Sequence, residues 1–294
     1  MMRRLVIDRV NTLWMVTALI SILILPVLIG LALYFKASPL FATQHFFSLL
    51  SSSTWVPLEG QFGFWPFIAG SIYVTILSFL FAAPVCLLAG IYLTQYASAR
   101  LIRVMYPVID ILAGLPSVIF GVWGILIIVP FVGKVLAPLF NVTSSGYSIL
   151  AGGVVLAVMC IPYMLNMLIE VFKTVPVELK EASLSMGATY WESVKHVVLR
   201  RSYSGIISSY GLGLAKAFGE TLAVLMVVGN MVQVSINPFE AGYPLPALIA
   251  NNYGEMLSIP RYDSALMFAA FLLLVIILII NAFFRYMIHH LKRR

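Results

Sequence analysis

Charged residues are scarce in this sequence. Only 10% of its 294 residues are Asp, Glu, Lys or Arg, whereas 62% are hydrophobic. Soluble domains average about 25% charged residues, so the composition excludes an ordinary soluble domain and predicts an integral membrane protein. Cysteine is scarce as well. Cys86 and Cys160 both lie inside apolar runs and behave as small hydrophobic residues, so they say little about the redox compartment.

The residue patterns of metal and nucleotide chemistry are also missing. The four histidines have no metal-ligand spacing to cysteines or carboxylates. The pair His289–His290 is interpreted as a helix end at the membrane surface, with weak metal binding as the alternative. The sequence has no G-x4-G-K-[ST] phosphate-binding loop and no Ser/His/Asp constellation placed for hydrolysis. We therefore expect no metal, no cofactor and no catalytic residue on this chain, and predict that it is not an enzyme.

Long apolar runs dominate what is present. A membrane-spanning helix needs about 20 apolar residues, and these runs are too long for barrel strands of about 9–11 residues. The first run follows a basic start and exceeds the roughly 7–15 residues of a signal-peptide core, so we expect it to be retained. The predicted fold class is an all-α integral membrane protein with six transmembrane helices. The six runs are 13–35, 66–94, 105–130, 148–172, 204–230 and 264–288.

The basic residues are divided unequally between the two sides of such a bundle. Cytoplasmic loops carry an excess of Lys and Arg, so the richer side is predicted to be cytoplasmic, with both termini on it. That side receives fourteen cations: Arg3, Arg4, Arg9, Arg100, Arg103, Lys173, Lys180, Lys195, Arg200, Arg201, Arg285, Lys292, Arg293 and Arg294. The other side receives three, Lys36, Lys134 and Arg261, and its longest segments, 36–65 and 231–263, are expected to form short re-entrant or surface helices.

The inner loop 173–203 is patterned rather than loose. Pro176 suits a first helical turn, and Gly187 suits the position just after a helix end. The run Thr189-Tyr-Trp-Glu192 is a capping box for a second helix. The loop is therefore predicted to be a rigid protrusion of two helices with a binding role. A surface helix lying on anionic lipid is the alternative.

The fifth run combines small residues with two charges. Small residues at every fourth position allow close helix packing on two faces, which predicts a central helix. They are Gly205, Ser209 and Gly213, and again Gly211, Ala215 and Gly219.

Lys216 is expected near mid-membrane, where a charge costs at least about 2.5 kcal/mol, and Glu220 is expected one turn further on the same face. The pair is interpreted either as a structural ion pair or as a switchable site in which Lys216 meets a passing oxyanion. A proton relay in a gradient-driven transporter, or a scaffold without transport, are further alternatives.

The third run holds Pro116 among Gly114, Gly121 and Gly124. A proline removes one helix hydrogen bond, so a kink is expected there, either beside a pathway or for packing alone. Asp110 lies near the cytoplasmic end of this run, as a surface-level charge or an intramembrane pairing group; the sequence leaves both open.

The segment "EASLSMG", Glu181–Gly187, followed by Val197 and Leu199, resembles the E-A-A-x3-G-x9-I-x-L-P signature of ABC importer permeases. Ser183 replaces the second Ala, Val197 the Ile, and Arg200 the usual Pro. In that family this loop forms a coupling helix seated in a cleft of the ATPase subunit. The resemblance implies that Glu181, Ala182 and Gly187 serve ATPase coupling.

Three segments in order, "DILAGLPSVIFGVWG", "VFKTVPVELKEAS" and "AKAFGETLAVLMVVGN", resemble the phosphate-specific ABC importers, and the last is closer to their C-type permease subunit. The resemblance implies a type I permease fold, with 1–63 as an N-terminal helix and outer segment and 64–294 as the permease core. It also implies a bacterial or archaeal cytoplasmic membrane. The expected substrate path contains Lys216, where the family usually has Arg, with Glu220, Thr221, Pro116 and Ser117.

The same resemblance implies partners. They are a second, A-type permease subunit, two ATPase subunits that bind the ATP, and a soluble phosphate-binding protein outside; no nucleic acid is expected. A permease for another oxyanion, such as molybdate, tungstate or sulfate, is the nearest alternative.

Overall fold

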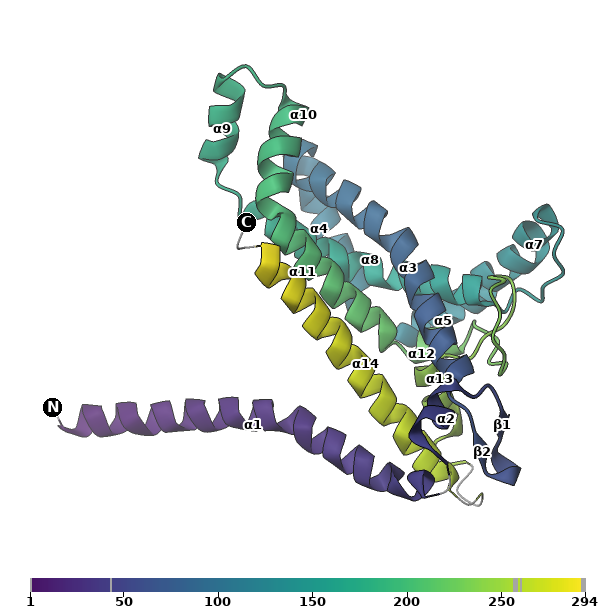
Figure 1. Cartoon of the computed structure of the whole chain (residues 1–294). Helices are drawn as coiled ribbons and strands as arrows, with labels where there is room; N and C mark the ends of the chain where they lie inside the picture. Colours follow the sequence, from purple (N-terminus) through teal and green to yellow (C-terminus); the bar gives the residue numbers. More distant parts are fainter. Residues whose placement is uncertain (1, 43, 256–258, 260, 292–294) are drawn as a thin grey trace.

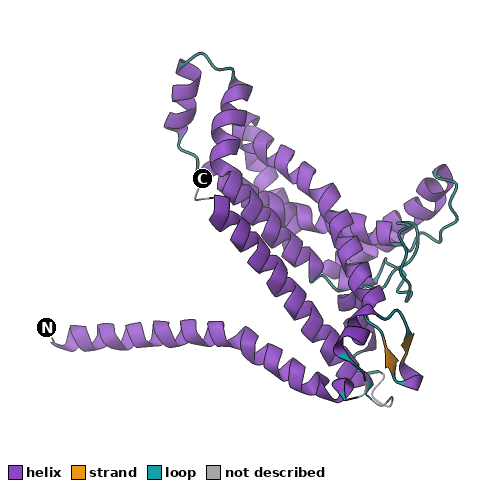
Figure 2. Cartoon of the chain, viewed as in Figure 1, coloured by secondary structure: helices purple, strands orange, loops and turns teal. Residues whose placement is uncertain are grey.

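The protein is mostly helical (Figure 2). The computed structural model describes residues 2–42, 44–255, 259 and 261–291. Within these residues, five helices are long and apolar enough to cross a membrane. The first is Asp8–Phe41, within α1 (Met2–Phe41), and the second is Trp65–Tyr96, which combines α3 (Trp65–Ile91) with η2 (Tyr92–Tyr96). The third is Ser117–Leu139, and the fourth is α8 (Ile149–Lys173). The fifth is Tyr262–His290, within α14 (Tyr262–Leu291).

Helix α11 (Leu199–Phe218) lies in the predicted fifth span, which is not among these five helices. It is less apolar than the others because it begins with Arg200 and Arg201 and contains several serines. It nevertheless packs against α8, α14 and α3 within the same bundle (Figure 1). It also continues without interruption from α10 (Tyr190–Ser193) and the π-helical turn η5 (Val194–Val198), since Arg200 keeps the backbone N–H that a proline would lack.

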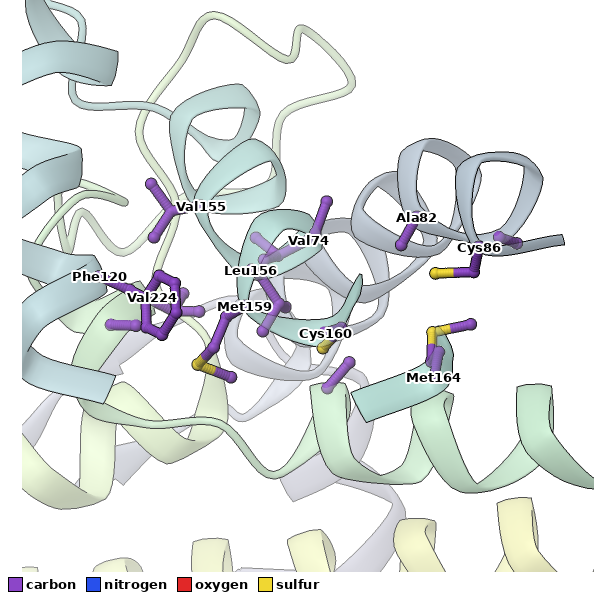
Figure 3. Close-up of a cluster of buried hydrophobic side chains, with 14 of the residues drawn as sticks. Val74, Ala82, Cys86, Phe120, Val155, Leu156, Met159, Cys160, Met164 and Val224 are labelled. Atoms are coloured by element: carbon purple, nitrogen blue, oxygen red, sulfur yellow. The ribbon is translucent and has the colours of Figure 1, made fainter. Parts of the chain in front are cut away.

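The core lies mainly between α3 and α8. Gly153 of α8 allows close approach, because a Cβ there would lie 2.9 Å from Leu77 of α3. Helix α12 (Leu222–Leu225) closes one end of this core through Val224. Figure 3 shows the buried side chains that meet here, among them Val74, Ala82 and Cys86 of α3 and Leu156, Cys160 and Met164 of α8.

The small-residue pattern of α11 is confirmed as a packing device on two faces. Gly205 lies against Val171 of α8, and a Cβ at Gly213 would lie 2.5 Å from Met164 Cγ on the same helix. On the other face, a Cβ at Gly211 would lie 2.5 Å from Phe284 Cγ of α14. Helix α11 is therefore held between α8 and α14 at distances that larger side chains would prevent.

We expect Gly211→Ala to destabilise the bundle by about 1–3 kcal/mol. The new Cβ would meet Cβ and Cγ of Phe284, and these atoms cannot move away without shifting α14. Gly219→Ala is the matched control, since its Cβ would lie 3.6 Å from the nearest side-chain atom, Ile277 Cδ1. The midpoint of thermal unfolding in detergent measures both. Equal midpoints for the two variants would contradict the close packing of α11 on α14.

The predicted third span, 105–130, is wrong in its position. Residues Ala99–Gly114 form a separate amphipathic helix, α4, capped by Ser98, whose hydroxyl accepts a hydrogen bond from the Leu101 N–H. The chain then extends at Leu115, because a residue before proline disfavours helical backbone. Pro116 precedes the next helix instead of kinking it. That helix contains α5 (Ser117–Trp123), η3 (Gly124–Ile128), α6 (Val129–Phe131), η4 (Val132–Leu136) and α7 (Ala137–Leu139).

The predicted fifth span, 204–230, is too long. The helix ends at Phe218, and after α12 the chain is largely irregular up to α13 (Leu245–Asn252). Gly229 adopts φ +91° there. Its neighbours bond to other segments: the Ser148 N–H donates to the Val227 carbonyl, and the Gly242 N–H donates to the Val228 carbonyl. Backbone bonds to distant segments thus replace those of a continued helix.

The outer segments contain the short helices expected of them. They hold α2 (Phe46–Ser51), α13, and a small antiparallel hairpin of β1 (Trp55–Val56) and β2 (Gln61–Phe62), joined by η1 (Pro57–Glu59). An aromatic cluster joins the hairpin to the bundle, with the Trp55 ring 4.8 Å from that of Phe67 on α3 and 6.0 Å from that of Tyr262 on α14.

Helix α1 joins the bundle only in its second half, where Tyr34 contacts Phe271 of α14. Its first half runs away from the other helices (Figure 1). The described end of α14 lies at the same end of the bundle as α9 (Val177–Ser185) and α10. Lys292, Arg293 and Arg294, which contribute to the predicted orientation, lie outside the described residues.

Candidate translocation site and coupling surface

Lys216 lies in the last turn of α11, and its ammonium nitrogen is 4.2 Å from the centre of the Tyr163 ring on α8. A cation over an aromatic face is attracted by the ring quadrupole. The end of a helix carries partial negative charge, which also favours a cation. Tyr163 is ten residues before the end of α8, so the contact lies about 15 Å inside the C-terminal end of that helix. The Lys216 side chain remains exposed on this chain.

Glu220 is separated from Lys216 by the end of α11. Its Oε1 accepts a hydrogen bond from the Ala223 N–H at 3.5 Å, and the residue lines a small cavity with Ser71 and Thr75 of α3. The expectation of one shared helical face is wrong, because the four-residue spacing holds only while the helix continues. Within the described residues, Lys216 and Glu220 form no ion pair; the described salt bridge joins Lys173 to Glu170.

The other three predicted path residues lie at the ends of helices. Thr221 stands at the start of α12, and its hydroxyl donates to the Gly219 carbonyl at 3.4 Å. Pro116 and Ser117 stand at the start of α5, which packs on α12. At that contact a Cβ on Gly121 would lie 2.5 Å from Met226 Sδ. The structure thus places all three near helix ends rather than within a helix.

A row of polar residues on α8 was not predicted from the sequence. Tyr163, Asn166 and Glu170 follow one face at spacings of three and four residues. The Asn166 Nδ2 donates to the Asp110 Oδ1 of α4 at 3.0 Å, so Asp110 is a pairing group for α8. Glu170 pairs with Lys173 at 2.7 Å. Polar groups therefore run from Lys216 to the C-terminal end of α8. The spacing of Tyr163, Asn166 and Glu170 was the sequence signal that could have revealed this row.

The inner loop has the predicted form of two helices and a glycine turn. Helix α9 ends at Ser185, Gly187 adopts φ +87°, and the Thr189–Glu192 capping box begins α10. The backbone N–H and hydroxyl of Thr189 both donate to the Glu192 carboxylate, which lowers the pKa of that carboxyl. Hydrogen bonds between residues close in the chain thus form the start of α10 after the glycine turn.

The two inner helices project from the end of the bundle (Figure 1). Glu181 and Ala182 are exposed on α9. Apolar side chains are exposed beside them, with Val177 63% and Met186 89% accessible. An exposed apolar surface of this kind, mixed with charges, is typical of a binding surface.

Comparisons with known proteins agree with this architecture. Residues 86–294 match the family described as "Binding-protein-dependent transport system inner membrane component". The phosphate transport system permease protein PstC of Xylella fastidiosa (strain Temecula1) is 35% identical over 261 residues, which cover 84% of this chain and 80% of that protein. A probable PstC of Methanocaldococcus jannaschii is 32% identical over 291 residues, covering 94% of this chain and 91% of that protein.

A chain in the inward-facing structure of the MetNI methionine ABC transporter superposes with a TM-score of 0.59. It is 21% identical and covers 77% of this chain and 96% of that chain. This likeness concerns the fold, and it confirms the predicted type I ABC importer permease fold. Because the family match extends over most of the sequence, the chain belongs to the family of binding-protein-dependent transport system inner membrane components.

Proposed function

We propose that this chain is the transmembrane permease subunit of an ATP-driven phosphate importer and forms half of its translocation path. The observation that carries the proposal is the 35% identity to a relative named as a phosphate transport permease, over 84% of the chain. The exposed Lys216 beside the core of the bundle supports it, because an oxyanion needs a positive group along its path.

The energy is supplied by partners. Two ATPase subunits bind ATP and dock at the inner loops, where Glu181, Ala182 and Gly187 lie. The second half of the path is an A-type permease subunit, and a soluble phosphate-binding protein docks outside on the segments 36–65 and 231–263. Nucleotide binding moves the coupling helices together and opens the path outward, and hydrolysis resets it. Both termini lie in the cytoplasm of a bacterial or archaeal cell.

Lys216 is the anion-binding group of the path in this proposal. Its ammonium rests on a ring instead of a carboxylate, so an arriving oxyanion has no anionic partner to displace. Glu220, Thr221, Pro116 and Ser117 shape the path from the helix ends around it. A lysine offers a point charge, whereas arginine would offer a planar fork to phosphate.

The test is uptake of labelled phosphate by vesicles that contain this chain, the second permease, the ATPase and the binding protein. We expect ATP-dependent uptake that excess molybdate does not displace, and no uptake when the ATPase is left out. Displacement by molybdate would identify another oxyanion as substrate. Uptake by this chain alone, driven by an ion gradient, would identify a secondary transporter.

A further inference from the structure

Three segments distant in sequence meet where the inner loop 173–203 joins the bundle. Lys180 of α9 donates from Nζ to the Gln95 Oε1 of η2 at 3.1 Å and to the Tyr190 hydroxyl of α10. The Tyr190 hydroxyl in turn donates to the backbone carbonyl of Gln95. We call these three residues the Lys180 joint. All of them are partly buried.

The chemistry of a helix end explains why the joint forms here. The last carbonyls of a helix have no partner within the helix. The long helix α3–η2 ends at Tyr96, so the Gln95 carbonyl is one of these, and the Tyr190 hydroxyl satisfies it. The Lys180 ammonium lies at the same helix end, whose partial negative charge favours a cation. It also lies 4.2 Å from the centre of the Tyr190 ring.

Hydrogen bonds of the Lys180 joint attach α9 to the end of α3. A cavity of about 310 Å³ lies beside it, lined by Lys180, Gln95, Tyr106, Lys173 and apolar residues of α8, α9 and η5. Across the described part of the chain, the side-chain hydrogen bonds between α9 and the α3–η2 helix all come from Lys180. The Ser193 hydroxyl of α10 adds a bond to the Lys180 carbonyl at 3.5 Å.

The joint stands at the start of the helix that carries Lys216. Tyr190 is the first residue of α10, and α10, η5 and α11 run on as one helix to Phe218. A displacement of α9 by an ATPase subunit therefore reaches Lys216 only if α9 and the start of this helix move together. The joint ties both to the end of α3 by hydrogen bonds, and the Tyr96 ring of η2 lies 5.0 Å from the Tyr190 ring beside it.

We propose that Lys180, Tyr190 and Gln95 are positioning residues that couple movement of α9 to the helix bearing Lys216, so that ATP hydrolysis drives transport. This inference rests on the proposed function, because it requires an ATPase at α9. Lys180 and Gln95 lie outside the signature that implies a coupling role for Glu181, Ala182 and Gly187, and Tyr190 occupies one of its unspecified positions. The proposal gives none of the three a contact with the substrate.

The experiment measures ATP hydrolysed per phosphate transported by the reconstituted complex. We expect Lys180→Met to raise this ratio about tenfold and Tyr190→Phe to raise it a few-fold, because each removes a hydrogen bond of the joint. Lys180→Arg keeps the cation and should stay near the native ratio. The double variant should be no worse than Lys180→Met alone, because both changes break one joint.

Tyr92→Phe is the matched control, since it removes a hydroxyl from the same turn η2, where the Tyr92 side chain is exposed. Co-purification of the ATPase subunit with each variant shows whether the subunit still binds. A raised ratio in a variant that still binds it then reflects lost coupling between hydrolysis and transport. Unchanged ratios in Lys180→Met and Tyr190→Phe would overturn the proposal, as would loss of the ATPase subunit from both variants. Absence of phosphate uptake by the native complex would instead contradict the proposed function.

Discussion

Replacing Lys216 by Gln is expected to lower phosphate uptake at least tenfold, whereas Lys216→Arg should retain most of it. An ammonium and a single negative charge 4 Å apart attract by about 4 kcal/mol at an effective dielectric constant of 20. Part of that attraction is lost in removing both groups from water, and about 1.4 kcal/mol of net loss already gives a tenfold effect. Initial rates of labelled phosphate uptake at a series of concentrations measure it.

Lys134→Gln is the control for this experiment. Lys134 is an exposed lysine in η4, on another helix, and its loss should leave uptake unchanged. Tyr163→Phe should also keep most of the activity, because the ring under the ammonium is retained. Equal uptake by the Gln and Arg variants of Lys216 would refute the account of this residue as an anion-binding charge.

Gly187→Val is expected to weaken binding of the ATPase subunit by roughly tenfold. Gly187 has φ +87°, a conformation that costs a residue with a Cβ about 1–2 kcal/mol, and more for a β-branched one. No atom lies within 4 Å of its Cβ position, so the effect comes from the backbone rather than from a clash. The dissociation constant of the purified permease pair and the ATPase subunit measures it.

Gly187→Asn is the matched variant, because asparagine adopts a positive φ more readily than other residues with a side chain. It should bind the ATPase subunit within a few-fold of the native chain. If Asn and Val weaken binding equally, the loss reflects a contact with the glycine itself and not the shape of the turn.

The sequence was sufficient where the signals are local. The form of the inner loop 173–203 was predicted closely, because Gly187 and the Thr189–Glu192 capping box form its turn through neighbours in the chain. The packing of α11 on two faces was also predictable, since the spacing of Gly205, Gly213 and Gly211 is itself the contact surface.

The ends of the spans were not predictable, because distant segments decide them. Residues 219–230 are as apolar as a membrane helix, yet their backbone bonds go to the chain around Ser148 and Gly242. The predicted third span, 105–130, begins within α4, because the packing of this helix is also decided by a distant segment. That helix is amphipathic and packs on α8, and the chain turns only at Leu115–Pro116.

The pairing of the candidate site was also beyond the sequence. Lys216 and Glu220 have the spacing of a helical pair, and the amino-acid sequence alone does not show that the helix ends between them. The spacing of Tyr163 and Asn166 on α8 could be read from the sequence, but their partners Lys216 of α11 and Asp110 of α4 reach them only through the packing of the helices.

The unbroken helix from Tyr190 to Phe218 has a mechanical consequence. Its 29 residues make a rod about 43 Å long, with Lys216 about 39 Å from the coupling loop. Tilting such a rod by only 5° about its inner end would carry the ammonium sideways by about 3 Å, roughly one hydrogen-bond length. A change of that size would make or break the proposed contact of Lys216 with an anion, so transport would need no large rearrangement near the site itself.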